Sequence, residues 1–116
     1  MDEKTAVITL AALAQGMRLR IFRSLIGAGP QGLTPSALAA TLDLPASTLS
    51  FHLKELLNSG LASQQREGRH LIYRPAIEHM NALMAHLLAH CCQGQEQDCA
   101  TGVPQTLKEK STERLR

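Results

Sequence analysis

Apolar side chains recur at three- and four-residue spacing through most of the chain before residue 93, as they do in amphipathic helices. This spacing predicts five helices, over residues 5–15, 17–28, 36–41, about 46–58 and about 76–92. The first helix is apolar on nearly every side, so we expect it to be buried on two sides. In the second helix, the spacing predicts an inner stripe of Leu19, Phe22 and Ile26.

The third and fourth helices carry clear start and stop signals. Thr34 is predicted to cap the third helix, with Pro35 in its first turn. Ser59 and Gly60 are predicted to end the fourth helix. The inner stripe of the fourth helix is predicted to consist of four leucines, Leu49, Leu53, Leu56 and Leu57. Its hydroxyl side chains and its histidine are then expected to point elsewhere.

A short β-hairpin is predicted after the fourth helix. Two extended runs, residues 61–66 and 69–74, flank a turn at Glu67 and Gly68, and Pro75 ends the second run. The order of elements is therefore helix, helix, short helix, helix, hairpin, helix. This order is typical of a winged helix-turn-helix, so the predicted class is mainly α with a small β part (α+β).

The length and composition bound the domain organisation. A chain of 116 residues suits one small domain, which we expect to span residues 1–92, and a core of this size makes oligomerisation plausible. Residues 93–116 are polar, and we expect a cysteine-containing loop and a loose tail there. No run approaches the roughly 20 apolar residues of a membrane span. The N-terminal sequence lacks the features of a secretory signal, so we expect a cytoplasmic protein without a membrane partner.

Charge is unevenly distributed along the chain. Residues 17–74 carry seven Lys and Arg against three Asp and Glu, whereas residues 75–102 carry three acidic side chains and no basic one. The middle of the chain is therefore the better candidate for a surface that binds a polyanion. The excess is modest, and an ordinary solvated face is the alternative.

The fourth helix has the side chains that a DNA-reading helix needs. A helix in the major groove carries small polar residues, because its backbone must approach the bases. Ser47, Thr48 and Ser50 supply hydroxyls that can donate to or accept from bases and phosphates. His52 and Lys54 are predicted to reach phosphates. The alternative for the hydroxyls is that they cap the helix.

The predicted hairpin adds two basic side chains. Arg66 and Arg69 flank its turn, where they can hold phosphates or enter the minor groove. The alternative is a charged edge that prevents strands of different molecules from pairing. In this order along the chain, helix and hairpin together predict a protein that binds double-stranded DNA.

Several motifs resemble those of the ArsR/SmtB family of metal-sensing repressors. They are Met17-Arg18-Leu19-Arg20-Ile21-Phe22, Leu49-Ser50-Phe51-His52-Leu53-Lys54-Glu55-Leu56, Ser59-Gly60-Leu61, Arg66-Glu67-Gly68-Arg69 and Tyr73. The resemblance covers about residues 5–92. It implies a homodimer that forms through the first and last helices and binds an inverted repeat in operator DNA to block transcription. It also implies that metal binding weakens the DNA complex.

The resemblance leaves the metal open. The family's Cys-x-Cys arsenic site before the reading helix is absent, because residues 36–44 contain no cysteine. His79 and His90 match two positions of the family's zinc site on the last helix, but Ile77 and Gln93 stand where further ligands belong. The zinc site is therefore expected to be incomplete, even if His86 substitutes for one ligand, and these histidines are expected to lie on the helix surface.

The cysteines are the better candidate ligands. Cys91, Cys92 and Cys99 are the chain's three cysteines, and they fall within nine residues. Gly94 is a natural helix stop that would let Cys99 fold back towards the other two. Three thiolates suit a three-coordinate soft ion such as As(III) or Sb(III) better than tetrahedral zinc. The pattern also resembles an ArsR-type subgroup with a vicinal cysteine pair and a third cysteine near the C-terminus.

We therefore predict an arsenite-responsive repressor that controls arsenic-resistance genes. Cadmium, lead or zinc, with His90 as a further ligand, are alternative inducers, and methylated As(III) needs only two thiolates. Oxidation of Cys91 and Cys92 to a disulfide is a second alternative, although adjacent cysteines form strained disulfides. An enzyme is not expected, because the chain has no phosphate-binding loop and no serine–histidine–acid set.

Overall fold

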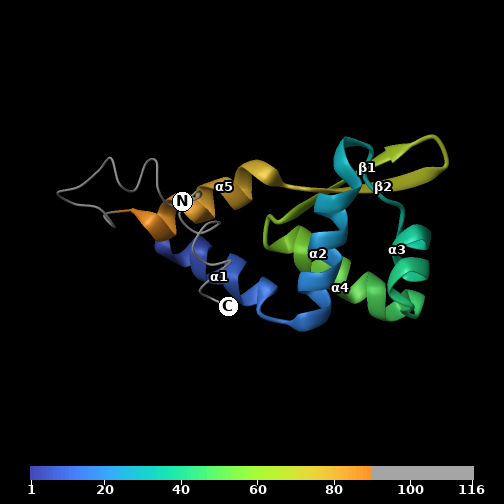
Figure 1. The fold of residues 1–116 in the computed structure, drawn as a ribbon, viewed down its shortest axis with the longest axis horizontal. Coiled ribbons are helices and arrows are strands. Elements are labelled where there is room, and N and C mark those ends of the chain that lie inside the picture. The colour runs from blue at the N-terminus through green and yellow to red at the C-terminus, as the bar shows by residue number, and fades with distance from the viewer. Residues whose placement is uncertain (90–116) are drawn as a thin grey trace, which may run out of the picture. The chain divides into compact units, whose positions relative to one another are not determined.

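We describe residues 1–89 of a computed structural model (Figure 1). The elements are α1 (Glu3–Leu13), α2 (Gly16–Ala28), a 3-10 helix η1 (Gly29–Gln31), α3 (Pro35–Leu42), α4 (Ala46–Asn58), β1 (Ala62–Glu67), β2 (His70–Pro75) and α5 (Ile77–Leu88). This order confirms the predicted winged helix-turn-helix fold. One compact unit spans Met1–His86. The predicted boundary after residue 92 lies outside the described residues.

The core lies between α2, α3, α4 and the base of the hairpin. Its most completely buried apolar side chains are Ile21, Leu25, Leu38, Leu49, Leu56 and Leu61. Thr34 caps α3 by accepting a hydrogen bond from the backbone N–H of Ala37 at 3.2 Å, with Pro35 following it, as predicted.

Among residues 1–89, no single helix is long and apolar enough to cross a membrane. One bent pair of helices, Glu3–Leu13 and Gly16–Gln31, has the length and apolar composition of a span only when the two are taken together.

The predicted inner stripe of α2 is partly wrong. Ile21, Phe22 and Leu25 are buried, whereas Leu19 and Ile26 are exposed. Both sets have helical spacing, so periodicity alone does not select between them. The packing of α2 against α3, α4 and β2 decides which set faces the core.

A single chain buries α1 on one side only. Ala6, Thr9 and Ala12 face inward, while Val7 and Ile8 are exposed. The inward residues are small, so α1 lies close to its neighbours and leaves its large apolar side chains uncovered. The predicted burial on two sides is therefore not reached within one chain.

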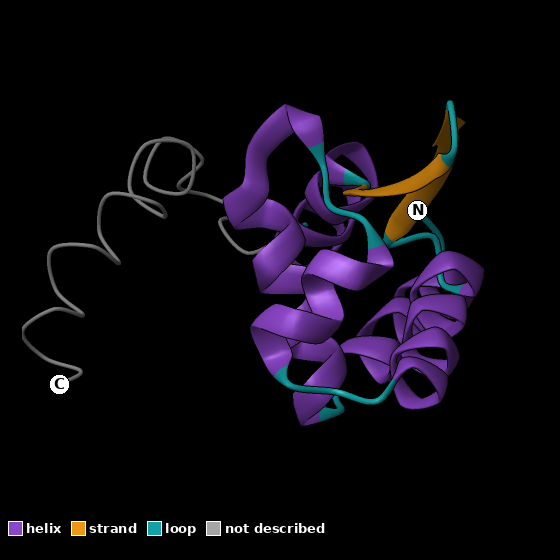
Figure 2. Cartoon of the chain, turned by 90° about the vertical axis from the view of Figure 1, so that its right-hand side faces the viewer, coloured by secondary structure: helices purple, strands orange, loops and turns teal. Residues whose placement is uncertain are grey.

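The hairpin projects beyond the helices (Figure 2). Glu67 pairs with His70, so the turn consists of Gly68 and Arg69 and lies one residue later than predicted. Gly68 has φ +66°, and the first central position of a tight hairpin turn favours glycine when φ is positive.

The base of the hairpin is held by a contact that the sequence pattern did not predict. Leu33 and Tyr73 exchange two backbone hydrogen bonds, at 2.8 and 3.0 Å, in an antiparallel bridge. Gly32 permits this close approach, because a Cβ there would lie 2.7 Å from the carbonyl oxygen of Tyr73. The segment before α3 thus fixes where the hairpin leaves the domain.

Candidate nucleic-acid interface

The outer face of α4 carries four predicted site residues. Ser47, Thr48, Ser50 and Lys54 are all exposed. The residue before the helix is Pro45, and within the described residues no side chain caps the α4 N-terminus. The serine and threonine hydroxyls therefore do not serve as caps, and they remain available to a partner of the helix.

The prediction that His52 reaches phosphates is wrong. Its side chain is only 8% exposed and lies on the inner face of α4. The cause is helical spacing, because position 52 follows Leu49 by three residues and precedes Leu56 by four. Burial, reinforced by the Arg18 guanidinium, lowers the pKa of His52 below its ordinary value. His52 is thus a neutral core residue at neutral pH.

The hairpin presents two basic side chains that have no acidic partner within residues 1–89. Arg66 and Arg69 are exposed, and neither forms an ion pair within residues 1–89. Arg74 differs from them, since its guanidinium donates to the Pro30 carbonyl at 2.7 Å and pairs with Glu67 at 3.0 Å. Arg74 therefore ties the hairpin to η1, whereas Arg66, before the turn, and Arg69, within it, carry the available charge.

One exposed residue on α4 was missed by the sequence analysis. Phe51 has 57% of its surface exposed although it is aromatic. It follows Ser47 by four residues and precedes Lys54 by three, so it shares their outer face. That spacing is a sequence signal that could have identified it.

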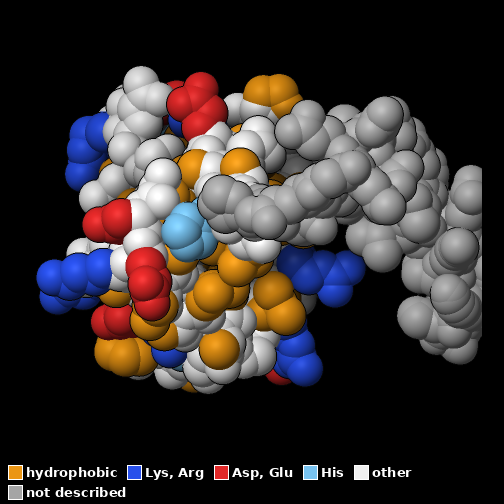
Figure 3. Space-filling view, turned by 90° about the vertical axis from the view of Figure 1, so that its left-hand side faces the viewer, with side chains coloured by type: hydrophobic (Ala, Val, Ile, Leu, Met, Phe, Trp, Pro, Cys, Tyr) orange, Lys and Arg blue, Asp and Glu red, His pale blue; other side chains and the backbone are white. Residues whose placement is uncertain are grey.

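A second exposed surface has the opposite chemistry. Val7, Ile8 and Leu10 on α1 and Met84 on α5 are large, apolar and exposed. Figure 3 shows hydrophobic side chains gathered on the side of the molecule that holds α1 and α5. We call these four residues the α1/α5 face. A contiguous exposed apolar surface commonly marks a protein–protein contact.

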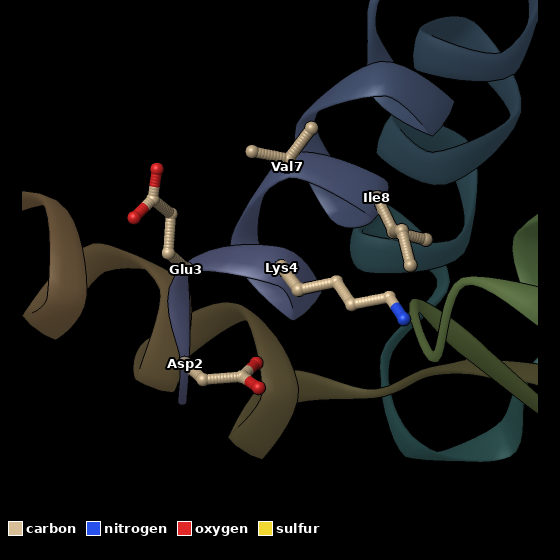
Figure 4. Close-up of a pocket in the computed structure, with 5 residues that line it drawn as sticks. All are labelled: Asp2, Glu3, Lys4, Val7 and Ile8. Atoms are coloured by element: carbon tan, nitrogen blue, oxygen red, sulfur yellow. The ribbon is translucent and has the colours of Figure 1, made fainter.

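The hollow beside this face is open. It measures about 600 Å³ and is lined by Asp2, Glu3, Lys4, Val7 and Ile8. Figure 4 shows these side chains spreading from the start of α1 without enclosing a chamber. Its shape suits a flat partner surface better than a small ligand.

Three helices meet at a hydrogen-bonded junction. The hydroxyl of Thr9 on α1 lies 2.9 Å from the carbonyl oxygen of Thr5 and 2.9 Å from Nε2 of His79 on α5. A hydroxyl has one proton, so donation to Thr5 requires His79 to donate from Nε2. A Cβ at Gly60, just beyond α4, would lie 2.8 Å from the His79 ring. His79 is therefore half-buried between helices, and the prediction that it lies on the helix surface is wrong.

The predicted metal ligands lie largely beyond the described region. Cys91, Cys92, Cys99 and His90 fall outside residues 1–89. Within residues 1–89, no group of three or more His, Cys, Asp or Glu side chains is placed to hold a metal ion.

Known proteins share both the helix-turn-helix and the whole fold of this chain. A helix-turn-helix domain family model matches residues 13–65. A search of curated proteins finds no match. An ArsR-like transcriptional regulator from Rhodococcus sp. RHA1 shares the fold, with 24% identity, coverage of 95% of this chain and 93% of that chain, and a TM-score of 0.65.

Two further solved structures are similar at higher identity. One is the homodimeric winged helix-turn-helix DNA-binding domain of Mb0332 from Mycobacterium bovis, described as a possible ArsR-family transcriptional regulator. It has 27% identity, coverage of 75% of this chain and 85% of that chain, and a TM-score of 0.60. The other is the transcriptional regulator HlyU from Vibrio vulnificus CMCP6, with 32% identity, coverage of 72% and 86%, and a TM-score of 0.56.

Proposed function

We propose the following function from the premise that this chain belongs to the ArsR family of winged helix-turn-helix transcriptional regulators. Two copies bind an inverted repeat in operator DNA and repress transcription. As(III) binds the C-terminal cysteines and releases the DNA, which allows expression of arsenic-resistance genes. The proteins that the chain resembles are transcriptional regulators rather than enzymes, and we assign it no catalytic role.

The outer face of α4 is the observation that carries DNA binding. Its three hydroxyl residues, Ser47, Thr48 and Ser50, are exposed and do not cap the helix. Small polar side chains let a helix backbone approach the base edges in the major groove. Lys54 extends from the same face and can neutralise a phosphate.

The hairpin supplies the second part of the interface. Arg66 and Arg69 have no acidic partner within the described residues, so their charge is available to the DNA backbone. Contacts of this kind fix the position of the protein on the duplex and make binding depend on salt. We assign base reading to α4 and backbone contact to the hairpin.

The α1/α5 face supports dimerisation. Its exposed apolar side chains lose water contact if a second copy covers them, which favours association by about 25 cal/mol for each Å² of apolar surface buried. A two-fold contact of α1 and α5 would relate the two α4 helices by the same symmetry that relates the half-sites of an inverted repeat. Two reading helices about 34 Å apart would match half-sites separated by one DNA turn.

The proposal for the inducer rests on the sequence. All three cysteines lie between residues 91 and 99, so a thiol-based response has to arise in that segment. Three thiolates match the pyramidal three-sulfur coordination of As(III), and Sb(III) shares this preference. A coupling of about 1–3 kcal/mol between this site and the DNA site would weaken DNA binding roughly 5–150-fold. A reducing compartment such as the cytoplasm keeps these thiols available.

The test is fluorescence anisotropy of the reduced protein on labelled DNA from upstream of its own gene. Arsenite, zinc, cadmium and peroxide are titrated in parallel. We expect arsenite to release the DNA from the wild-type protein. Cys91→Ser, Cys92→Ser and Cys99→Ser should each bind DNA normally and need more arsenite for release. A cysteine variant that loses DNA binding altogether would instead give that cysteine a structural role.

The titrations with peroxide, zinc and cadmium test a different inducing signal that would act on the same cysteines. Vicinal thiols can also respond to an oxidant or to a borderline metal. Release by peroxide alone would replace arsenite with thiol oxidation as the signal. Release by zinc or cadmium alone would replace it with a divalent metal, with His90 as a further ligand candidate.

A further inference from the structure

Phe51 is exposed where a buried aromatic would be expected. The chain has two phenylalanines, one tyrosine and no tryptophan. Phe22 is 5% exposed and Tyr73 is 7% exposed, whereas Phe51 is 57% exposed. An exposed phenylalanine gains nothing from the core of its own chain. Its position on the molecule therefore indicates which partner could cover it.

That position is the centre of the surface assigned to DNA. Ser47 and Lys54 flank Phe51 on the outer face of α4, at helical spacings of four and three residues, and Ser50 is exposed beside them. The exposed apolar residues of the α1/α5 face belong to other helices. Phe51 is thus a single apolar group within a polar reading surface rather than part of the dimer contact.

The ring also has a fixed neighbour. Its centroid lies 5.4 Å from that of the His52 imidazole, with an angle of 62° between the planes. His52 is buried, so it offers one firm wall beside the phenyl ring. An edge-to-face contact of this kind favours a defined ring position.

Among the groups that a duplex presents in the major groove, one is apolar. This group is the C5-methyl of thymine, and the remaining base edges present hydrogen-bond donors and acceptors. A phenyl ring cannot satisfy those polar edges, and covering one with it would cost hydration free energy. A phosphate likewise gains nothing from a phenyl ring.

We propose that Phe51 is a specificity-determining residue that packs against the C5-methyl group of a thymine in each operator half-site. This inference rests on the proposed function, because it requires α4 to enter the major groove. Ser47 and Ser50 then read polar base edges on either side, and Phe51 selects thymine over cytosine and over uracil. The contact transfers no proton and forms no covalent bond.

The test removes the methyl groups from the DNA and the ring from the protein. Two operator duplexes are compared, one with thymine and one with deoxyuridine at every thymine position. A buried methyl-sized group contributes about fourfold to binding at each of the two half-sites. We therefore expect the wild-type dimer to bind the uracil duplex about 16-fold less tightly. Phe51→Ala should bind both duplexes with equal affinity, close to that of the wild type on uracil DNA.

Ile26→Ala is the matched control variant. Ile26 is an exposed apolar residue on α2, in a hollow that it lines with Pro75 and Ile77. Ile26→Ala should keep the full preference for thymine DNA. Phe51→Leu, which retains an apolar side chain, should keep part of it. Circular dichroism and sedimentation establish that each variant is folded and has the wild-type oligomeric state.

The outcomes separate this inference from the proposed function. Equal binding of both duplexes by the wild type would overturn the role of Phe51 and leave DNA binding intact. A thymine preference that persists in Phe51→Ala would assign methyl recognition to another residue and overturn it as well. Failure of the wild type to bind either duplex would overturn the proposed function itself.

Discussion

The chain leaves two helical faces exposed, and their chemistry is opposite. On α1, the exposed side carries Val7, Ile8 and Leu10, which are apolar. On α4, the exposed side carries hydroxyls and a lysine, with Phe51 as the exception. The exposure of a helix face therefore does not by itself identify the partner that binds there. The side chains on the exposed face indicate the partner, which we infer to be a second copy for α1 and DNA for α4.

The buried sides of the two helices differ as well. α4 inserts Leu49, Leu53 and Leu56 into the core of its own chain. The inner face of α1 consists of small residues, Ala6, Thr9 and Ala12, so it contributes little apolar volume to that core. The apolar face of α4 is therefore buried within one chain, whereas the large apolar side chains of α1 stay exposed unless a partner covers them.

A charge on the α1 face should have the largest effect. Val7 is 56% exposed in the single chain, and Val7→Glu would bury an unpaired carboxylate in the dimer contact. We expect the dimer to dissociate and operator affinity to fall by more than about 100-fold, since a buried unpaired charge costs several kcal/mol. Val7→Ala is the control and should weaken the dimer only moderately. Sedimentation velocity measures the change, and a stable Val7→Glu dimer would contradict the assignment of this face.

Removing a hairpin charge should have a smaller and salt-dependent effect. Arg69→Ala removes one proposed phosphate contact from each chain. The slope of log Kd against log salt concentration should fall by about two for the dimer. Arg23→Ala, which removes an exposed charge from α2, should leave this slope unchanged. An equal loss of slope in both variants would show a general charge effect rather than a contact made by the hairpin.

The junction between α1, α4 and α5 should contribute modestly to stability. Thr9→Val keeps the side-chain volume but removes the hydroxyl that contacts Thr5 and His79. We expect the free energy of unfolding to fall by about 1–2 kcal/mol, as for other lost buried hydrogen bonds. Thr5→Val, one turn earlier on the same face but less buried, is the control and should cost less. Chemical denaturation measures both, and equal stability of Thr9→Val and wild type would show that the junction contributes nothing.

Burial of His52 should make stability depend weakly on pH. The pKa of His52 is lowered in the folded chain, so the unfolded chain binds its proton first as pH falls. The free energy of unfolding should therefore decrease below about pH 6.5, and level off once pH is below the folded-state pKa. His52→Leu should remove this part of the pH dependence. A denaturation series from pH 8 to pH 5 that gives parallel curves for both proteins would contradict it.

Much of the fold could be predicted from the sequence, because element order depends on periodicity and local stop signals. The winged helix-turn-helix followed from five helical patterns and one hairpin pattern. The buried face of α2 could not be predicted, because two stripes of residues have the same helical period. Only the packing of α2 against its neighbours buries Ile21 and Leu25 rather than Leu19 and Ile26. The bridge between Leu33 and Tyr73 joins distant segments and left no local signal.

The candidate site was predicted less completely. The exposed positions of Ser47, Ser50 and Lys54 agree with the prediction, because they follow from helical phase. The same helical spacing puts His52 on the inner face and Phe51 on the outer face. The prediction for His52 was wrong because it assumed that a polar side chain faces outward. The cysteine site stays a prediction, because its residues fall beyond the described part of the chain.

The most direct test of the account counts the chains on one operator. Sedimentation of the reduced protein with a labelled duplex carrying both half-sites gives the stoichiometry of the complex. We expect two chains per duplex, and weak, salt-sensitive binding to a duplex with scrambled half-sites. One chain per duplex would contradict the assignment of α1 and α5 to contact with a second copy. Equal affinity for the scrambled duplex would contradict the assignment of α4 to base reading.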